Sequence, residues 1–290
     1  MRLATLQDGG KAAIVEDEWL LDLETLGAQA DLQAAARQSV RGLLEADPSA
    51  LERLRTVLAK GGAEHRIGPL ADHRLGPPIP DPEKIVCVGL NYAEHVVETQ
   101  RADPGHATLF AKFRNSLAGP ADPIPLPAAS KQVDYEGEIA VVIGRGGKMI
   151  PARDALGHVA GAMAFNDVTA RDLQYRSTQW LAGKAVDGFG PCGPTLVTLD
   201  ELGDLRALRI QTRVNGVTVQ DAPATMMLRG VPELIAEISE SMTLEPGDII
   251  CTGTPGGVGS RREPPLWLRD GDLVEVEVDR IGTLVNPVAG

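Results

Sequence analysis

Short apolar runs separated by turn residues recur along the second part of the chain. Their length and their content of Val and Ile predict β-strands, which we place at residues 84–88, 138–143, 208–214, 248–251 and 272–278. Asn215-Gly216 interrupts such a run and predicts a type I′ hairpin turn. One helix is expected at residues 231–241, where Pro232 lies near the start. A single convincing helix among these strands argues against a doubly wound parallel sheet and indicates an α+β, mostly β fold.

The first 75 residues have a different organisation. Residues 1–26 are expected to form short strands with a turn at Gly9-Gly10, and the Ala, Leu and Arg-rich stretches within residues 29–59 predict helices. Residues 75–83 contain four prolines, which cannot donate backbone hydrogen bonds inside a helix or a sheet. We therefore expect a small N-terminal α+β domain (1–75), a Pro-rich linker (76–83) and a catalytic domain (84–290).

The composition is that of a globular protein and argues against several classes of partner. With 43% hydrophobic residues the chain can bury a sizeable core, and its formal net charge of −12 argues against nucleic acid or an anionic membrane surface. The N-terminus lacks a signal-peptide stretch and no apolar run approaches the ~20 residues of a membrane span, so we expect a cytoplasmic protein. Cys87, Cys192 and Cys251 are too widely spaced to indicate a disulfide framework or a zinc cluster.

Two glutamates, Glu136 and Glu138, stand at the start of one of the predicted strands and are the most informative feature of the chain. Residues i and i+2 of a strand point to the same face, so the two carboxylates are expected side by side. Asp167 follows far enough along the chain for the backbone to return beside them. Three carboxylates suit a hard cation, Mg²⁺ or Mn²⁺.

Acidic pairs of this spacing also arise by chance, because 40 of the 290 residues are Asp or Glu. The apolar run after Glu138 favours the metal site, since buried carboxylates are costly without a cation or hydrogen bonds. Asp134 is expected on the same face as the two glutamates. Its role stays open among a metal ligand, a partner of a ligand and a solvated residue at the start of the strand.

Two further segments carry residues suited to acid–base chemistry or to anion binding. If a short helix follows the strand at 84–88, His95 and Glu98 are i, i+3 neighbours, and the carboxylate can orient the imidazole as in a water-activating pair. An ion pair on a helix surface explains the same spacing. Lys184 lies among glycines and apolar residues, where it can stabilise a developing oxyanion or be an exposed loop lysine.

Taken together, five motifs resemble the fumarylacetoacetate hydrolase family from about residue 84 to residue 288. They are VGLNYAEH (88–95), DYEGE (134–138), FNDVTARDLQ (165–174), Lys184 with DGFGP (187–191), and LEPGD (244–248) running into TGTP (252–255). The resemblance implies a mixed β-roll catalytic domain that pairs into a homodimer and binds Mg²⁺ or Mn²⁺, with the metal chelating a small 2-oxo acid substrate.

The resemblance also implies roles for individual residues. The metal ligands would be Glu136, Glu138 and Asp167, the catalytic residues His95, Glu98 and Lys184, and the substrate contacts Gln174 and Thr254. In the family the residues that match His95 and Glu98 form a water-activating dyad on a mobile lid. We expect residues 99–108 to belong to this lid and to influence specificity.

These roles lead to a hypothesis for the reaction, which is hydrolysis of a C–C bond in a 2,4-dioxo acid such as an acylpyruvate, fumarylpyruvate or a diketo sugar acid. The family motifs do not exclude decarboxylation of oxaloacetate, or isomerisation and decarboxylation of unsaturated 2-oxo diacids. A hypothesis from a different class is a non-catalytic metabolite-binding protein with the same fold.

One departure from the family pattern concerns the predicted pocket. Where many relatives have Phe-x-Lys-Pro, this chain has Phe110-Ala111-Lys112-Phe113-Arg114. The added cation predicts that Arg114 contacts a polar or anionic distal group of the substrate.

Overall fold

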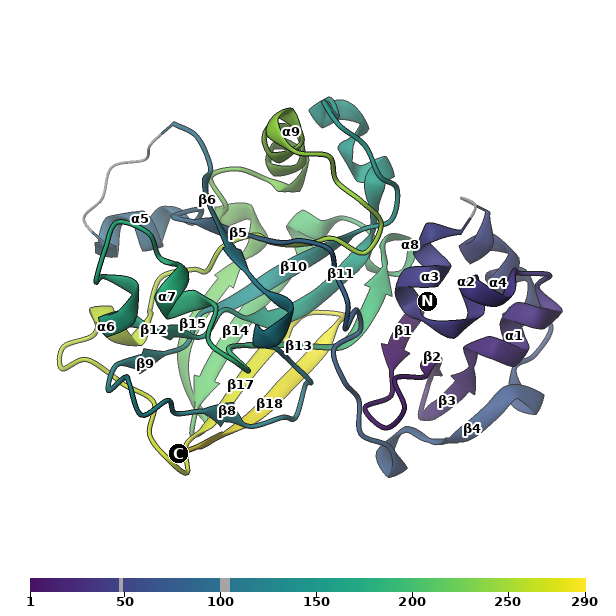
Figure 1. Ribbon diagram of the computed structural model, residues 1–290, viewed down its shortest axis with the longest axis horizontal. Coiled ribbons are helices and arrows are strands. Elements are labelled where there is room, and N and C mark those ends of the chain that lie inside the picture. Colours follow the sequence, from purple (N-terminus) through teal and green to yellow (C-terminus); the bar gives the residue numbers. More distant parts are fainter. Residues whose placement is uncertain (47–48, 100–104) are drawn as a thin grey trace.

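One large β-sheet runs through the N-terminal and the C-terminal parts of the chain (Figure 1). The computed structural model describes residues 1–46, 49–99 and 105–290. In these residues the sheet has eleven strands, in the order β4-β3-β2-β1-β13-β11-β10-β16-β5-β6, with β7 paired to β13. The strands are β1 (Arg2–Thr5), β2 (Ala12–Glu16), β3 (Trp19–Asp22), β4 (Arg66–Pro69), β5 (Ile85–Gly89), β6 (Thr108–Lys112), β7 (Leu117–Ala118), β10 (Gly137–Ile143), β11 (Val159–Asn166), β13 (Gly190–Thr198) and β16 (Ile249–Cys251).

A second sheet of five strands shares a core with the first, in the order β15-β14-β17-β18-β8. Its strands are β8 (Ile124–Pro125), β14 (Arg209–Val214), β15 (Val217–Pro223), β17 (Leu273–Val278) and β18 (Gly282–Ala289), and a short ladder joins β9 (Val133–Asp134) to β12 (Thr169–Ala170). Ile139 and Val141 of β10 lie in the same core as Val276 of β17. Ala140 and Val142 belong to a core on the other side, shared with the N-terminal helices. Strand β10 is therefore buried on both faces, which explains its continuous apolar run.

Helices lie at both ends of this arrangement and along one side of it (Figure 1). Those of the N-terminal part are α1 (Leu23–Gln29), α2 (Ala34–Gln38), α3 (Val40–Glu45) and α4 (Ala50–Leu58), and those of the remainder are α5 (Ala93–Thr99), α6 (Arg171–Gln174), α7 (Leu181–Lys184), α8 (Leu199–Leu202) and α9 (Val231–Ser241). Short 3₁₀ turns are η1 (Ala63–His65), η2 (Leu70–Asp72), η3 (Arg114–Ser116), η4 (Ala152–His158), η5 (Leu205–Ala207), η6 (Ala224–Met226) and η7 (Gly259–Arg261).

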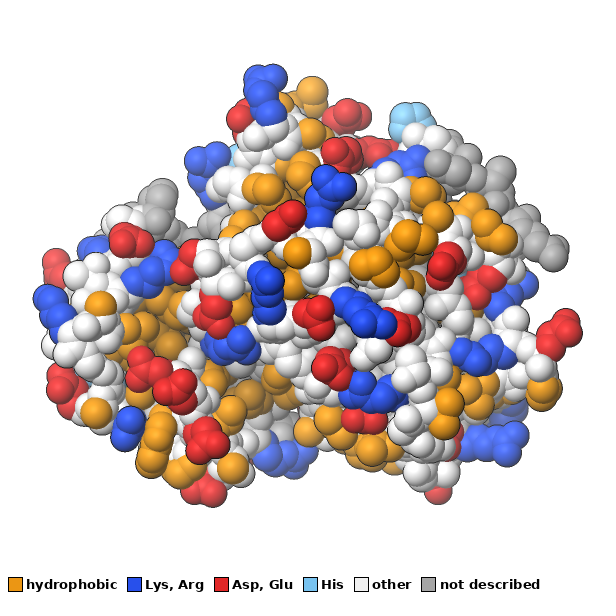
Figure 2. Space-filling view, turned by 180° about the vertical axis from the view of Figure 1, so that it is seen from behind, with side chains coloured by type: hydrophobic (Ala, Val, Ile, Leu, Met, Phe, Trp, Pro, Cys, Tyr) orange, Lys and Arg blue, Asp and Glu red, His pale blue; other side chains and the backbone are white. Residues whose placement is uncertain are grey.

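Within the described ranges, no helix combines the length and the apolar character that crossing a membrane requires. On the face shown in Figure 2, acidic and basic side chains intermingle. The excess of acidic residues is therefore not gathered into one patch on that face.

The observed elements agree with the predicted ones where the sequence signal was local. The five predicted strands of the second domain begin and end within one residue of β5, β10, β14, β16 and β17, and the predicted helix coincides with α9. Asn215 (φ 51°) and Gly216 (φ 76°) make the turn between β14 and β15. The α+β, mostly β fold class is confirmed.

The N-terminal unit does not form a sheet of its own. Strand β1 pairs antiparallel with β13, with Leu3 opposite Leu196, so the central sheet continues across residues 76–83 into the remainder of the chain. Residues 76–83 contain neither helix nor strand. The division into two domains stays a prediction, because a shared sheet does not tell whether the two parts fold independently.

Asp248 fixes the starts of two neighbouring parallel strands, β5 and β16. Its buried carboxylate accepts hydrogen bonds from the backbone N–H groups of Lys84 (3.0 Å) and Glu245 (2.7 Å), and it pairs with the Lys84 ammonium (2.9 Å). The resulting register places Cys251 beside Cys87. The segments that follow these two strands carry site residues, so Asp248 contributes to their alignment.

Replacing Asp248 by Ala should lower the free energy of unfolding by about 2–3 kcal/mol, because two backbone N–H groups and an ammonium lose a buried partner. The thermal midpoint should then fall by roughly 3–5 °C, measured by scanning calorimetry. Asp8 is exposed in a turn, and D8A should change the stability by less than about 0.5 kcal/mol. A D248A protein as stable as D8A would contradict this role.

Candidate active site

Glu136, Glu138 and Asp167 meet where β10 begins and its antiparallel neighbour β11 ends. Gly137 lies opposite Asn166, so the chain returns beside the two glutamates as the sequence predicted. Glu136 lies between β9 and β10, and the N–H of Asp167 donates to its carbonyl (2.8 Å). One oxygen from each of the three buried carboxylates lies within 4.8 Å of the others. The predicted metal ligands are therefore assembled in one place.

Buried cations surround these carboxylates. The Lys184 ammonium pairs with Glu136 (2.6 Å) and with Asp167 (2.7 Å). The ammonium of Lys112 contacts the other oxygen of Asp167 (2.9 Å) and donates to the backbone carbonyl of Lys184. Arg171 pairs with the second oxygen of Glu136 (2.6 Å). Each contact fixes the orientation of a carboxylate before any ligand is bound.

The distribution of these charges gives the two glutamates very different pKa values. Burial raises the pKa of Glu136, but Lys184 and Arg171 outweigh burial and lower that pKa to about 2. Burial and the neighbouring Asp167 raise the pKa of Glu138 well above its usual range. Burial lowers the pKa of Lys184, but the carboxylates of Asp167 and Glu136 outweigh burial and raise it, so the side chain stays an ammonium. Glu138 is thus the carboxylate whose negative charge is least compensated.

The charge balance and the ligand type of this cluster both fit a divalent cation. If every member is ionised, four carboxylates face three cations, so one negative charge is in excess. The carboxylates are Asp134, Glu136, Glu138 and Asp167, and the cations are Lys112, Arg171 and Lys184. Oxygens of Glu136, Glu138 and Asp167 would hold an Mg²⁺ or Mn²⁺ ion, for which carboxylate oxygens are preferred ligands. Such an ion would replace the proton that the raised pKa of Glu138 favours.

His95 and Glu98 form the predicted pair on helix α5. The imidazole Nδ1 lies 2.7 Å from a carboxylate oxygen of Glu98, whose other oxygen accepts the N–H of Gly257 (2.8 Å). Because an ionised carboxylate only accepts hydrogen bonds, Nδ1 carries the proton and Nε2 is left as an acceptor. His95 is buried and lines the same cavity as Glu136 and Glu138.

The segment after β16 links the helix that carries His95 to the carboxylates. The Asn91 side chain donates to the carbonyls of Thr252 (2.8 Å) and Arg229 (2.9 Å), which holds the start of α5. Gly253 donates its N–H to Glu138 (2.8 Å). Gly253 has a φ of 99°, which side chains rarely permit, and a Cβ added to it would lie only 2.9 Å from the Cβ of Asn91. This position therefore requires glycine.

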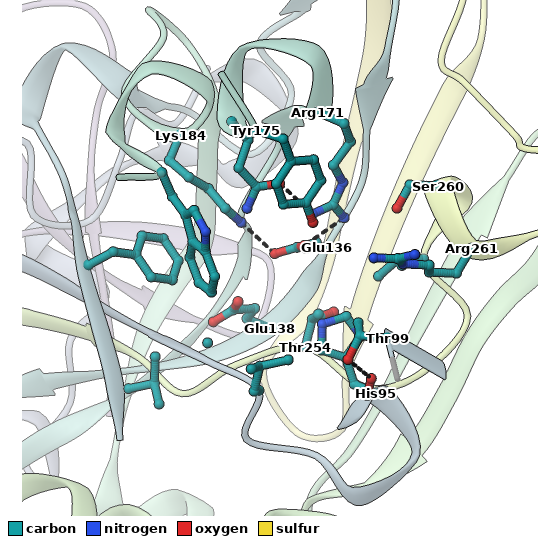
Figure 3. A pocket seen from close by; sticks show the side chains of 17 residues that line it. His95, Thr99, Glu136, Glu138, Arg171, Tyr175, Lys184, Thr254, Ser260 and Arg261 are labelled. Atoms are coloured by element: carbon teal, nitrogen blue, oxygen red, sulfur yellow. Dashed lines mark hydrogen bonds and ion pairs between the residues drawn. The ribbon is translucent and has the colours of Figure 1, made fainter. Parts of the chain in front are cut away.

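Six of the nine predicted site residues line a single cavity (Figure 3). Its lining includes His95, Glu136, Glu138, Gln174, Lys184 and Thr254. The cavity volume is about 30 Å³, far below the several hundred cubic ångströms typical of sites for drug-sized ligands, so the cavity favours a small substrate. Gln174 accepts a hydrogen bond from Arg171 (3.1 Å), and the Thr254 hydroxyl donates to the Gly137 carbonyl (2.9 Å). Contacts of Gln174 and Thr254 with substrate stay a prediction.

Arg114 lies elsewhere, so the structure does not support the predicted substrate contact. Strand β6 ends at Lys112, and Arg114 begins the turn η3, exposed to solvent and beside a different surface depression that Lys84 and Met242 also line. The alternation of a strand would have kept Arg114 on the face of Phe110 and Lys112, but that alternation stops where the strand stops. Of the predicted lid, residues 100–104 lie outside the described part of the chain.

Asp134 connects Arg171 to a loop of the cavity wall and is not a member of the metal-binding group. Its carboxylate pairs with Arg171 (2.8 Å) and accepts the N–H groups of Gly259 (2.8 Å) and Ser260 (3.0 Å). The sequence left three roles open for Asp134. The role observed is that of a partner of a metal ligand, because Asp134 pairs with Arg171, and Arg171 pairs with Glu136.

Sequence reasoning missed three cations of the site: Lys112, Arg171 and Arg261. Lys112 is a buried lysine in a strand, and Arg171 follows Asp167 by four residues within a recognised motif. A cation in an otherwise apolar segment could have indicated in both cases that the side chain pairs with a buried carboxylate. Arg261 lines the cavity and is followed by a second arginine, Arg262. No pattern in the sequence distinguishes the two.

Comparison with known proteins places the chain in a family. The family described as "Fumarylacetoacetate (FAA) hydrolase C-terminal" matches residues 84–289. The chain is 45% identical over 246 residues, covering 84% of this chain and 78% of the relative, to a protein named oxaloacetate tautomerase Fahd2a, mitochondrial, from Rattus norvegicus. It is 44% identical over 223 residues, covering 76% and 74%, to the oxaloacetate tautomerase YisK of Bacillus subtilis (strain 168).

A solved structure supports the same assignment over the full chain. The crystal structure of a putative HpcE protein from Mycobacterium smegmatis superimposes with a TM-score of 0.87 at 34% sequence identity, covering 100% of this chain and 99% of the other. The assembled site agrees with this match, because the residues of the recognised motifs converge on one cavity. The chain belongs to the fumarylacetoacetate hydrolase family.

Proposed function

We propose that this protein is a divalent-metal-dependent enzyme that interconverts the keto and enol forms of a small 2-oxo diacid, with oxaloacetate as the substrate. One observation carries the proposal: a group that can accept and return a proton, His95, shares a cavity with a buried carboxylate cluster and an ammonium. The names of relatives at 44–45% identity support the choice of oxaloacetate.

The reaction needs a base near C3 and positive charge near the C2 oxygen. Bound by Glu136, Glu138 and Asp167, an Mg²⁺ or Mn²⁺ ion would supply Lewis acidity toward the carboxylate and ketone oxygens of the substrate. Lys184 stays an ammonium, so it stabilises negative charge that develops on oxygen and does not act as a nucleophile. Its contacts to Glu136 and Asp167 hold it in place for this role.

The proton transfer falls to His95. In the direction from keto to enol, the free Nε2 removes a proton from C3, the C2–C3 bond becomes double, and the imidazolium so formed delivers a proton to the C2 oxygen and is neutral again. The reverse direction returns a proton to C3, and no water is consumed in either. Glu98 stabilises the imidazolium through its 2.7 Å contact to Nδ1.

A second candidate uses the same groups to cleave a C–C bond. His95 and Glu98 are also suited to activating water, and attack of that water on the distal carbonyl of a 2,4-dioxo acid would release the enolate of a 2-oxo acid. Decarboxylation of oxaloacetate passes through the same kind of enolate. The three reactions differ in stoichiometry, since tautomerisation keeps all four carbons of oxaloacetate, decarboxylation releases CO₂, and hydrolysis consumes water.

Proton NMR of oxaloacetate with catalytic amounts of protein and Mg²⁺ separates these reactions. We expect the enol and keto signals to reach equilibrium faster than without protein, while the total amount of the four-carbon acid stays constant. Pyruvate formed from oxaloacetate would replace the proposal by a decarboxylase. Pyruvate and a second acid formed from an acylpyruvate, with oxaloacetate unaffected, would replace it by a hydrolase.

Replacing His95 by Ala should lower kcat/KM for the tautomerisation by about 100-fold or more, because the proton acceptor is lost. His73 is a half-buried histidine of the N-terminal part of the chain and does not line the cavity, so H73A should keep kcat/KM within about twofold. The ratio of the two effects is the measurement. Activity of H95A within a few-fold of that of H73A would assign the proton transfer to another group.

The cation site can be tested without turnover. Adding Mn²⁺ at about 100 times its Kd to chelator-treated protein should stabilise the fold by about 2.7 kcal/mol. Because the pKa of Glu138 is raised in the absence of metal, the cation must displace a proton at pH values below that pKa, and its affinity should increase as the pH rises. Titration calorimetry in buffers of different ionisation enthalpy measures the released proton.

The matched variants for this test are E138Q and E240Q. E138Q removes one ligand charge and should abolish the stabilisation by Mn²⁺, whereas E240Q changes an exposed glutamate of α9 and should retain it. Equal stabilisation of the two variants would exclude Glu138 as a ligand.

A further inference from the structure

Two consecutive arginines, Arg261 and Arg262, have different environments. Arg262 is engaged with the protein, since it donates to the Tyr135 hydroxyl (3.1 Å) and to the carbonyls of Gly257 (3.2 Å) and Val219 (2.6 Å). Arg261 is exposed, and its backbone N–H donates to the Val258 carbonyl (3.2 Å), but its side chain makes no hydrogen bond or ion pair with any described residue. Its guanidinium extends into the cavity on the side opposite Lys184, toward Glu136 (Figure 3).

The backbone that carries Arg261 is fixed by the same charge cluster that forms the metal-binding group. Asp134 accepts the N–H groups of Gly259 and Ser260, the two residues before Arg261, and Asp134 also pairs with Arg171. At Gly259 a Cβ would lie 2.1 Å from the Leu266 carbonyl oxygen and 2.6 Å from the Asp134 carboxylate, so only glycine permits this approach. The guanidinium of Arg261 is therefore carried by a constrained loop.

The other lining cations already have partners. Lys184 bridges Glu136 and Asp167, and Arg171 is divided among Asp134, Glu136 and Gln174. Among the cations that line this cavity in the described ranges, Arg261 is the one whose donors all remain available. A planar guanidinium with free donors is the group best suited to bind a carboxylate through two hydrogen bonds.

We propose that Arg261 binds the distal carboxylate of the substrate and so selects 2-oxo diacids over 2-oxo monoacids. The inference rests on the proposed function, in which the 2-oxo carboxylate end of the substrate lies at the metal-binding group. With a divalent cation, the buried cluster carries a net charge of +1, and Arg261 brings the cavity to +2. Two carboxylates match this charge, whereas a monoacid leaves one positive charge without a partner.

The test compares oxaloacetate with 2-oxobutyrate, a monoacid of the same carbon number. Turnover of oxaloacetate is measured as keto–enol conversion, and that of 2-oxobutyrate as exchange of C3 protons with D₂O. R261A should raise KM for oxaloacetate by about 10-fold or more with little change in kcat, because a charge-assisted contact to the substrate is lost. Its effect on 2-oxobutyrate should stay within about twofold. R261K should give an intermediate KM for oxaloacetate, because lysine keeps the positive charge but cannot bind a carboxylate through two parallel N–H groups.

Arg269 provides the matched control, since it is exposed and lies outside the cavity. R269A makes the same change in net charge and should leave both substrates unaffected. If R261A weakens both acids equally, or neither, Arg261 does not select the distal carboxylate.

Calorimetric binding of the two acids to the Mg²⁺-loaded protein separates failure of this inference from failure of the proposed function. A preference for oxaloacetate that disappears in R261A supports the role of Arg261 even in the absence of tautomerase activity. A preference that survives in R261A overturns the role of Arg261 alone. No binding of either acid to the unmodified protein would overturn both.

Discussion

The structure buries four carboxylates beside the cavity, and these need positive charge close to them. Glu136 and Asp167 each lie within 3 Å of two buried cations, and removing one of these cations would leave its carboxylate with less compensation. One negative charge remains uncompensated, and its effect is the raised pKa of Glu138. A fold that buries such a cluster gains little stability from it, so its presence points to a ligand that completes the balance.

The two sheets provide the geometry that this compensation needs. Antiparallel pairing of β10 with β11 brings Asp167 beside the glutamates, and parallel pairing of β5 with β16 brings the helix of His95 beside the segment that binds Glu138. Burial of β10 on both faces removes water from the carboxylates at its start. The same apolar packing that holds the sheets together therefore strengthens the electrostatic interactions in the cavity.

Features set by short stretches of sequence were predicted, and the return of Asp167 beside the glutamates was predicted from its distance along the chain, but the sheet that joins the two parts of the chain was not. Helix α9, the turn at Asn215 and the spacing of Glu136 and Glu138 follow from local rules. The pairing of β1 with β13 joins residues far apart in the chain, for which no local pattern exists. Arg114 was selected because it departs from a family motif, but the end of β6 turns it away from the cavity. Arg261 supplies a cation at the cavity instead, and only the structure separates it from Arg262.

We propose that a divalent cation meets the uncompensated charge of the buried cluster, and anomalous diffraction from crystals soaked in Mn²⁺ tests this proposal. We expect one strong peak at about 2.2 Å from oxygens of Glu136, Glu138 and Asp167, with the Lys184 ammonium still in contact with the cluster. A difference map without a peak at these carboxylates, from crystals that bind Mn²⁺ elsewhere, would contradict it.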